Sequence, residues 1–237
     1  MTARHVVEPI MRTAPFTQQQ QPQLPFQPQL SDNNVIIDLC YEWNSLPSDP
    51  NHIYYFESEI VYESVNLDTV IVKLKPDTKA FPPPLTRFTD VTRLSQDTSH
   101  GYFIGHSQAD IKKTDKYDSV TLTKSDIDNA KKWSMDFEKV DGYEGIENQQ
   151  RVHFHCSFEQ GASGSPGFWI NPGDGQAYVE LMLLCGYPKW LYNKYQGNTR
   201  EIPNHFLVEQ GVSMKSVYDD VKARDALLCN AVFGTKS

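Results

Sequence analysis

Residues 151–187 read RVHFHCSFEQGASGSPGFWINPGDGQAYVELMLLCGY, and they carry the clearest fold signal in the chain. Three runs that are apolar or alternate between apolar and polar residues cover 151–158, 165–170 and 177–187. Short runs of this kind, separated by turn residues, are typical of the strands in an all-β barrel or sandwich. The segment 171–175, Asn-Pro-Gly-Asp-Gly, has the residues that a β-hairpin turn requires. The sequence therefore predicts an all-β protein.

Similar short runs of apolar or alternating residues occur on both sides of this stretch. Further strands are expected at 35–42, 53–64, 68–75, 102–106, 119–124 and 205–211. A proline-rich break, AFPPPLT, separates the two series, so we predict a first lobe at 1–79, a linker at 80–100 and a second lobe at 101–237. The strands of the second lobe are enough to close a small barrel. Apolar residues near helical spacing predict a C-terminal amphipathic helix at about 212–232.

Residues 14–34 differ from the rest of the first lobe. They are rich in glutamine and proline and offer little apolar surface to bury, so we expect a solvated loop or insertion.

Composition excludes several classes of protein. The formal net charge of −8 repels a phosphate backbone, so direct nucleic-acid binding by this segment is not expected. The 4 cysteines lie far apart without a C-x-x-C pair, which favours reduced thiols in an intracellular protein over a zinc ribbon or a disulfide scaffold. No apolar run reaches the roughly 18 residues of a transmembrane helix, so no membrane partner is expected.

The string GASGSPGF at 161–168 is the strongest candidate for chemistry. A serine between glycines, here Ser163, can sit on a tight turn with its hydroxyl exposed. Gly161 would let the backbone turn its amide outward, so that the amides of Gly161 and Ser163 together could bind a developing oxyanion. The same composition also forms ordinary turns, and a serine needs a base and an orienting carboxylate to become a nucleophile.

Two further strings supply those partners by resemblance. TARHVV at 2–7 resembles the context of the base histidine in trypsin-like serine proteases, and LDTVIVKL at 67–74 resembles the element that carries the orienting aspartate. His5, Asp68 and Ser163 follow the chymotrypsin order of triad residues. The resemblance implies a chymotrypsin-like double β-barrel and a serine endopeptidase that needs no cofactor and acts on protein or peptide substrates.

The strings GYFIGH at 101–106, IKKTD at 111–115 and VEQGVSMKSV at 208–217 are similar to the nuclear "family with sequence similarity" trypsin-like proteases. This narrower resemblance implies a nuclear or chromatin-associated location and substrates such as proteins crosslinked to DNA. Whether the chain forms a homodimer is left open.

Two positions depart from the digestive members of the family. Ala162 stands where those enzymes have an aspartate that pairs with a newly freed N-terminus, so activation by that ion pair is not expected. Only 4 residues precede His5, whereas the family places strands of the first barrel before this histidine. We therefore expect an incomplete first barrel and a chain shortened at its N-terminus.

The resemblance also suggests which residues bind the side chain of P1, the substrate residue whose carbonyl is attacked. Ser157 stands where a preference for lysine or arginine needs an aspartate, and Cys185, Gly186 and Tyr187 resemble the wall of the specificity pocket. The glycine leaves room for a bulky side chain, so an aromatic or large apolar P1 residue is predicted.

Three other interpretations stay open. His153, His155 and Cys156 on one strand invite a metal hypothesis, but no second cluster matches them, and we predict no metal site. The protein could be a catalytically inactive module that binds a peptide in the cleft or along a strand edge. It could also be a fragment made inactive by truncation.

Overall fold

The computed structural model describes residues 1–12, 29–30, 36–38, 53–76, 81, 83–87, 100–106, 112–139, 142–158, 161–188, 190–191 and 206–234. The chain divides into two compact units, Met1–Pro84 and Leu85–Ser237. Most of the predicted insertion at 14–34 and of the predicted linker at 80–100 lies outside the described residues, as does Cys40. Among the described helices, none is long and apolar enough to cross a membrane.

Unit 1 contains a sheet of 6 strands. The strands and helices are β1 (Thr2–Ala3), α1 (Arg4–Val7), η1 (Glu8–Ile10), β2 (Met11–Arg12), β3 (Gln29–Leu30), β4 (Ile36–Asp38), β5 (Ile53–Ser64) and β6 (Thr69–Leu74). The strand order is β1-β6-β5-β3-β2, with β4 also paired to β5. The long hairpin of β5 and β6 was predicted within one residue at each end, whereas β1, β2 and β3 were not predicted. Each of these three is only 2 residues long, too short to show a period in the sequence.

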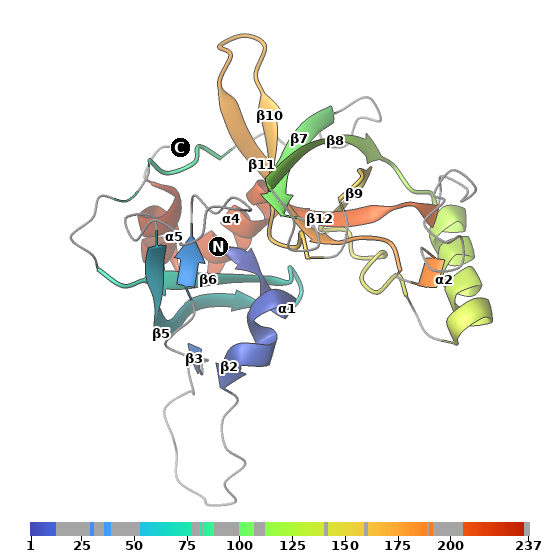
Figure 1. Ribbon diagram of the computed structural model, residues 1–237, viewed down its shortest axis with the longest axis horizontal. Helices are drawn as coiled ribbons and strands as arrows, with labels where there is room; N and C mark the ends of the chain where they lie inside the picture. Colours follow the sequence, from blue (N-terminus) through green and yellow to red (C-terminus); the bar gives the residue numbers. More distant parts are fainter. Residues whose placement is uncertain are drawn as a thin grey trace, which may run out of the picture. The chain divides into compact units, whose positions relative to one another are not determined.

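Unit 2 contains a closed barrel with the strand order β10-β11-β12-β9-β8-β7. Its strands are β7 (His100–His106), β8 (Lys112–Val120), β9 (Arg151–His155), β10 (Pro166–Ile170), β11 (Ala177–Cys185) and β12 (Glu209–Ser213). Figure 1 shows β10 and β11 as a hairpin whose turn stands clear of the rest of this barrel. The closed barrel, the separate sheet and the C-terminal helices together confirm the predicted all-β fold class and are consistent with a chymotrypsin-like fold.

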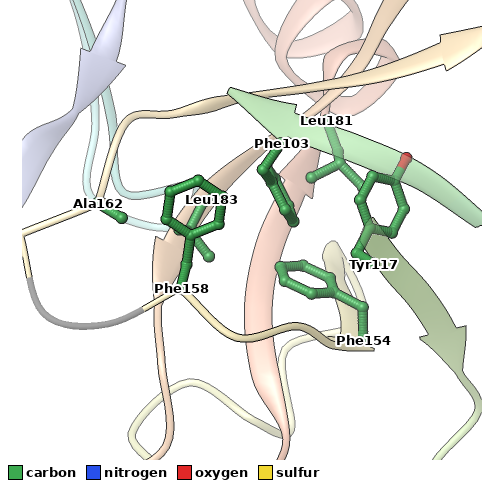
Figure 2. Packing of buried hydrophobic residues seen from close by; sticks show 7 residues of the cluster. All are labelled: Phe103, Tyr117, Phe154, Phe158, Ala162, Leu181 and Leu183. Carbon is green, nitrogen blue, oxygen red and sulfur yellow. The ribbon is translucent and has the colours of Figure 1, made fainter. Parts of the chain in front are cut away.

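Aromatic side chains fill the barrel of unit 2. On β7 the buried Phe103 alternates with the exposed Tyr102 and Ile104, as expected when successive side chains point to opposite faces. The ring centroid of Phe103 lies 4.8 Å from that of Tyr117 and 5.0 Å from that of Phe154. Figure 2 shows how these rings pack beside Leu181, with Phe158, Leu183 and Ala162 completing the cluster.

Strand β8 and a helix of unit 2 show that the prediction of a strand at 119–124 was wrong in its bounds. Strand β8 begins at Lys112 and not at 119, because its outward positions are charged and hide the alternation around the buried Tyr117. Residues 121–124, assigned to that strand, instead lead into helix α2 (Lys124–Glu138), which was not predicted. Thr123 caps α2 in a reciprocal capping box with Asp126, and this T-x-x-D spacing is the signal that could have revealed it.

The predicted C-terminal helix is two helices, α4 (Met214–Arg224) and α5 (Ala226–Phe233). Asp225 interrupts them with φ −150° and ψ 99°, and its carboxylate caps α5 by accepting hydrogen bonds from the amides of Leu227 and Leu228. The expected helix start at 212 was two residues early, because Val212 and Ser213 belong to β12.

Candidate active site

His5 and Asp68 meet in unit 1 through strand pairing. Strand β1 pairs with β6, and this pairing places Ala3 opposite Thr69. The residues after Ala3 therefore lie beside Asp68, which precedes Thr69. The carboxylate of Asp68 makes two contacts with His5. Its Oδ2 lies 2.7 Å from the ring Nδ1, and its Oδ1 accepts the backbone N–H at 3.0 Å. The amide of Arg4 also donates to the carbonyl of Asp68 at 2.9 Å, so this contact is held by main chain as well as side chain.

This arrangement determines what the imidazole of His5 can do. An ionised carboxylate at Nδ1 favours the tautomer that carries its proton there, which leaves Nε2 with a lone pair. The side chain of His5 is 41% exposed, whereas that of Asp68 is 18% exposed. The ring is therefore oriented from one side and accessible from the other, as a general base requires.

The turn that carries Asp68 is well fixed. Asp68 has φ 50°, in the left-handed region that aspartate and asparagine tolerate better than most residues. Its amide donates to the carbonyl of Val65 at 3.1 Å, and the neighbouring Leu67 is buried. The hydroxyl of Thr69 donates to the carbonyl of Leu67 at 3.0 Å. The carboxylate therefore sits on a backbone with little freedom to move away from His5.

Ser163 lies in unit 2, on the loop between β9 and β10. The loop turns sharply at Gly161 and Gly164, whose φ angles are 96° and 91°, a region that favours glycine. The amide of Gly164 donates to the carbonyl of Leu183 at 2.8 Å, and the amide of Ser165 donates to the carbonyl of Ala162 at 3.0 Å. The first bond ties the loop to β11 just after Ser163, and the second closes a turn within the loop around Ser163.

The two amides predicted to bind an oxyanion lie on this loop. Among the described residues, neither the Gly161 amide nor the Ser163 amide donates a backbone hydrogen bond. The side chain between them, Ala162, is 2% exposed and packs with Phe158 and Leu183 in the barrel core (Figure 2). A carboxylate at position 162 would have to enter this apolar cluster, so the loop is held by packing where digestive enzymes use an ion pair.

The predicted specificity residues cluster around a residue that sequence reasoning missed. Ser157 and Gly186 are exposed, and Cys185 is the last residue of β11. The thiol of Cys156, next to Ser157, donates a hydrogen bond to Oε2 of Glu209 on β12. A Cβ placed on Gly186 would lie 4.0 Å from Oε1 of the same carboxyl group. Glu209 therefore bonds the residue next to Ser157 and lies close to Gly186.

Tyr187 has different surroundings from its neighbours. It packs against the second cluster of unit 2, which includes Ala130 of α2 together with Tyr143, Ile146, Leu191 and Phe206. Its assignment to the pocket wall stays a prediction.

Burial shifts the proton equilibria around Glu209. Glu209 is fully buried, and desolvation raises the pKa of its carboxyl group to about 8, with a smaller contribution from the nearby charge of Asp115. Burial and the adjacent Glu209 carboxyl raise the pKa of the Cys156 thiol as well. The thiol therefore stays protonated and acts as a hydrogen-bond donor near neutral pH.

A pH dependence of stability follows from the raised pKa of Glu209. In the unfolded chain this carboxyl group loses its proton near pH 4.5, whereas the folded chain keeps it up to about pH 8. Between these values the unfolded state binds fewer protons, so this group lowers the free energy of unfolding by up to about 1.4 kcal/mol per pH unit as pH rises. The substitution Glu209→Gln removes that effect. We expect its stability relative to wild type to increase steadily from pH 5 to pH 8 in urea unfolding, and parallel curves would contradict the assignment.

The two histidines of β9 differ in their surroundings. Nδ1 of His155 lies 2.8 Å from the carbonyl oxygen of Leu207, and burial lowers the pKa of His153. Among the described residues, no group of three or more histidine, cysteine, aspartate or glutamate side chains is arranged to hold a metal ion. Within the described part of the chain, Cys156, Cys185 and Cys229 form no disulfide bond.

The two halves of the predicted triad belong to different units. The structure brings His5 and Asp68 together in unit 1 and places Gly161 and Ser163 on one loop of unit 2. The pairing of His5 with Ser163 stays a prediction.

Comparison with known proteins bears on this arrangement. No family model matches the chain. The chain is similar to the human protein "Serine protease FAM111B", with 29% identity over 211 residues that make up 79% of this chain and 26% of that protein. The chain thus spans about a quarter of the length of this curated relative. The match and the β-barrel fold thus show a likeness between this chain and a trypsin-like serine protease.

Proposed function

We propose that the chain is a serine endopeptidase in which His5, Asp68 and Ser163 form the catalytic triad. The observation that carries the proposal is the double contact of the Asp68 carboxylate with the ring and the backbone amide of His5, at 2.7 Å and 3.0 Å. This contact orients an accessible imidazole with its Nε2 lone pair outward, which is the arrangement of a general base next to a hydroxyl nucleophile.

The proposed reaction has two halves. Nε2 of His5 removes the hydroxyl proton of Ser163 while Oγ attacks the substrate carbonyl carbon, and the carbonyl electrons move to its oxygen. The amides of Gly161 and Ser163 stabilise that oxyanion. When the tetrahedral intermediate collapses, the peptide C–N bond breaks and the leaving amine takes the proton from His5. Water then attacks the acyl ester in the same way, releasing the new carboxyl end and restoring Ser163.

The enzyme is proposed to work without an activating ion pair beside the nucleophile. Ala162 cannot pair with an N-terminal ammonium group, and the burial of its side chain anchors the loop by apolar contact instead. No cofactor enters the reaction.

The substrate proposal has two parts. Ser157 offers no charge to a basic P1 side chain, and the absent side chain of Gly186 leaves space, so an aromatic or large apolar P1 residue is favoured. The resemblance to nuclear proteases extends the proposal to proteins bound in chromatin or crosslinked to DNA as substrates, and to the nucleus as the site of action.

A peptide library tests this function. We expect the chain of residues 1–237 to cleave a mixed library of unstructured peptides mainly after phenylalanine, tyrosine, leucine or methionine, as read by mass spectrometry of the products. Cleavage after lysine and arginine would contradict the predicted specificity. Peptide retention without cleavage, equal in the wild type and in Ser163→Ala, would instead identify an inactive peptide-binding module.

A further inference from the structure

Glu209 is a buried acid that the proposed reaction does not use. It lies at the start of β12, opposite Phe154 of β9, and its side chain is fully buried. One carboxyl oxygen, Oε2, accepts the hydrogen bond from the Cys156 thiol. The other, Oε1, is buried and has no hydrogen-bond partner in the part of the chain that the structure describes. Buried polar atoms normally find a partner, so an unpaired carboxyl oxygen in a core calls for an explanation.

The surroundings of Oε1 indicate where a partner could come from. Gly186 is exposed, and a Cβ at this position would lie 4.0 Å from Oε1, with no other described atom outside the adjacent residues within that distance. Because Gly186 has no side chain, open space at the surface comes within 4.0 Å of this buried oxygen. Ser157, which adjoins the thiol on the other oxygen, is exposed as well. Both exposed residues are among those that the sequence assigned to P1 recognition.

The other acidic group of this region already has a partner. The carboxylate of Asp115 accepts the backbone N–H of Ser157, and it lies close enough to Glu209 to raise the pKa of that residue. Asp115 thus helps to fix the Ser157 segment, whereas Glu209 has the oxygen that is free to receive a substrate group.

We propose that Glu209 is a specificity-determining residue, and that its Oε1 hydrogen-bonds the phenol hydroxyl of a P1 tyrosine that enters beside Gly186. This inference rests on the proposed peptidase function and sharpens its substrate class from aromatic residues in general to tyrosine. A phenylalanine in the same place would leave Oε1 unpaired, as it is in the free protein, and would lack the hydrogen bond that a tyrosine hydroxyl supplies.

The protonation state of Glu209 favours a neutral group over a cation. With its pKa raised to about 8, the carboxyl group is mostly protonated near pH 7 and offers a lysine or arginine side chain less charge than an ionised carboxylate would. A phenol hydroxyl can donate to a carboxyl oxygen or accept from a carboxyl O–H, so it matches either protonation state.

The test compares peptides that are identical except for tyrosine or phenylalanine at P1. The readout is the ratio of their kcat/KM values, measured with the wild type and with Glu209→Met, Glu209→Gln and Glu180→Gln. We expect the wild type to prefer tyrosine by about tenfold, which is what one additional hydrogen bond of ordinary strength contributes. Glu209→Met should reduce the ratio to about 1 because it removes both oxygens, and Glu209→Gln should retain most of it.

Glu180→Gln is the matched control, since Glu180 is also a buried acid of this barrel but bonds Tyr117. Its ratio should equal that of the wild type. A wild-type ratio near 1, a preference for basic residues, or an unchanged ratio in Glu209→Met would overturn the inference while leaving the peptidase in place. If neither peptide is cleaved, the proposed function fails and this inference fails with it. The wild-type ratio keeps the test decisive even if Glu209→Met does not fold.

Discussion

The substitution Ser163→Ala is expected to lower kcat for peptide hydrolysis by about 10⁴-fold or more, which is the loss that removal of a triad nucleophile causes. The physical reason is that no acyl ester can form without the hydroxyl. Alanine fits the loop without strain, because the sharp turns are made by the glycines at φ 96° and 91° on either side of it. The measurement is steady-state hydrolysis of a peptide with an aromatic P1 residue.

Ser165→Ala provides a matched control for this loss. Ser165 lies on the same loop, and its side chain is buried against Gly105 in the barrel. We expect it to keep most of the activity, since its hydroxyl has no part in the proposed reaction. Equal rates for the wild type and Ser163→Ala would show that another residue performs the chemistry.

The substitution Asp68→Asn is expected to lower kcat by about 10⁴-fold while leaving the fold intact. An amide side chain can donate a hydrogen bond to Nδ1 of His5, which favours the tautomer with its proton on Nε2 and so removes the base. The backbone should not suffer, because asparagine also tolerates the φ of 50° at this position. Its side-chain oxygen can still accept the backbone N–H of His5, which Oδ1 accepts at 3.0 Å.

Thermal unfolding and activity together check this prediction. Asp118→Asn serves as the control, since Asp118 is an exposed aspartate of β8 that pairs with Lys116. Both variants should melt close to the wild type, and only Asp68→Asn should lose activity. A large loss of stability in Asp68→Asn would mean that the carboxylate holds the fold of unit 1, and retained activity would remove Asp68 from the triad.

The fold could be predicted wherever the pattern of apolar residues is local. Strands β5 and β10 have clear runs of apolar and aromatic residues and lie close to their expected bounds. Strand β8 could not be placed correctly, because its exposed face carries lysines and aspartates and only Tyr117 and Ser119 face inward. Helix α2 was hidden for a related reason. Few of its residues are buried, so its sequence shows no strong apolar pattern. Its apolar contact comes from packing against Tyr143 and Leu191, which lie outside the helix.

The candidate site also has residues that local motifs predict and a residue that only a long-range contact reveals. His5, Asp68 and Ser163 could be predicted as a triad because each stands in a short local motif that resembles a known family. Glu209 could not be singled out from the sequence, because its contact with Cys156 joins residues that are 53 positions apart along the chain. Whether an acid faces the barrel core or solvent depends on strand register.

The most direct test of Ser163 as the nucleophile is covalent labelling by a fluorophosphonate, which reacts with an activated serine but not with an ordinary hydroxyl. The wild-type chain and Ser163→Ala are treated under identical conditions, and the adduct is mapped by mass spectrometry. We expect one adduct, on Ser163, that is absent from Ser163→Ala and strongly reduced in Asp68→Asn. A wild-type chain that is folded and unlabelled, or one labelled at a different residue, would contradict the assignment of Ser163 as the nucleophile.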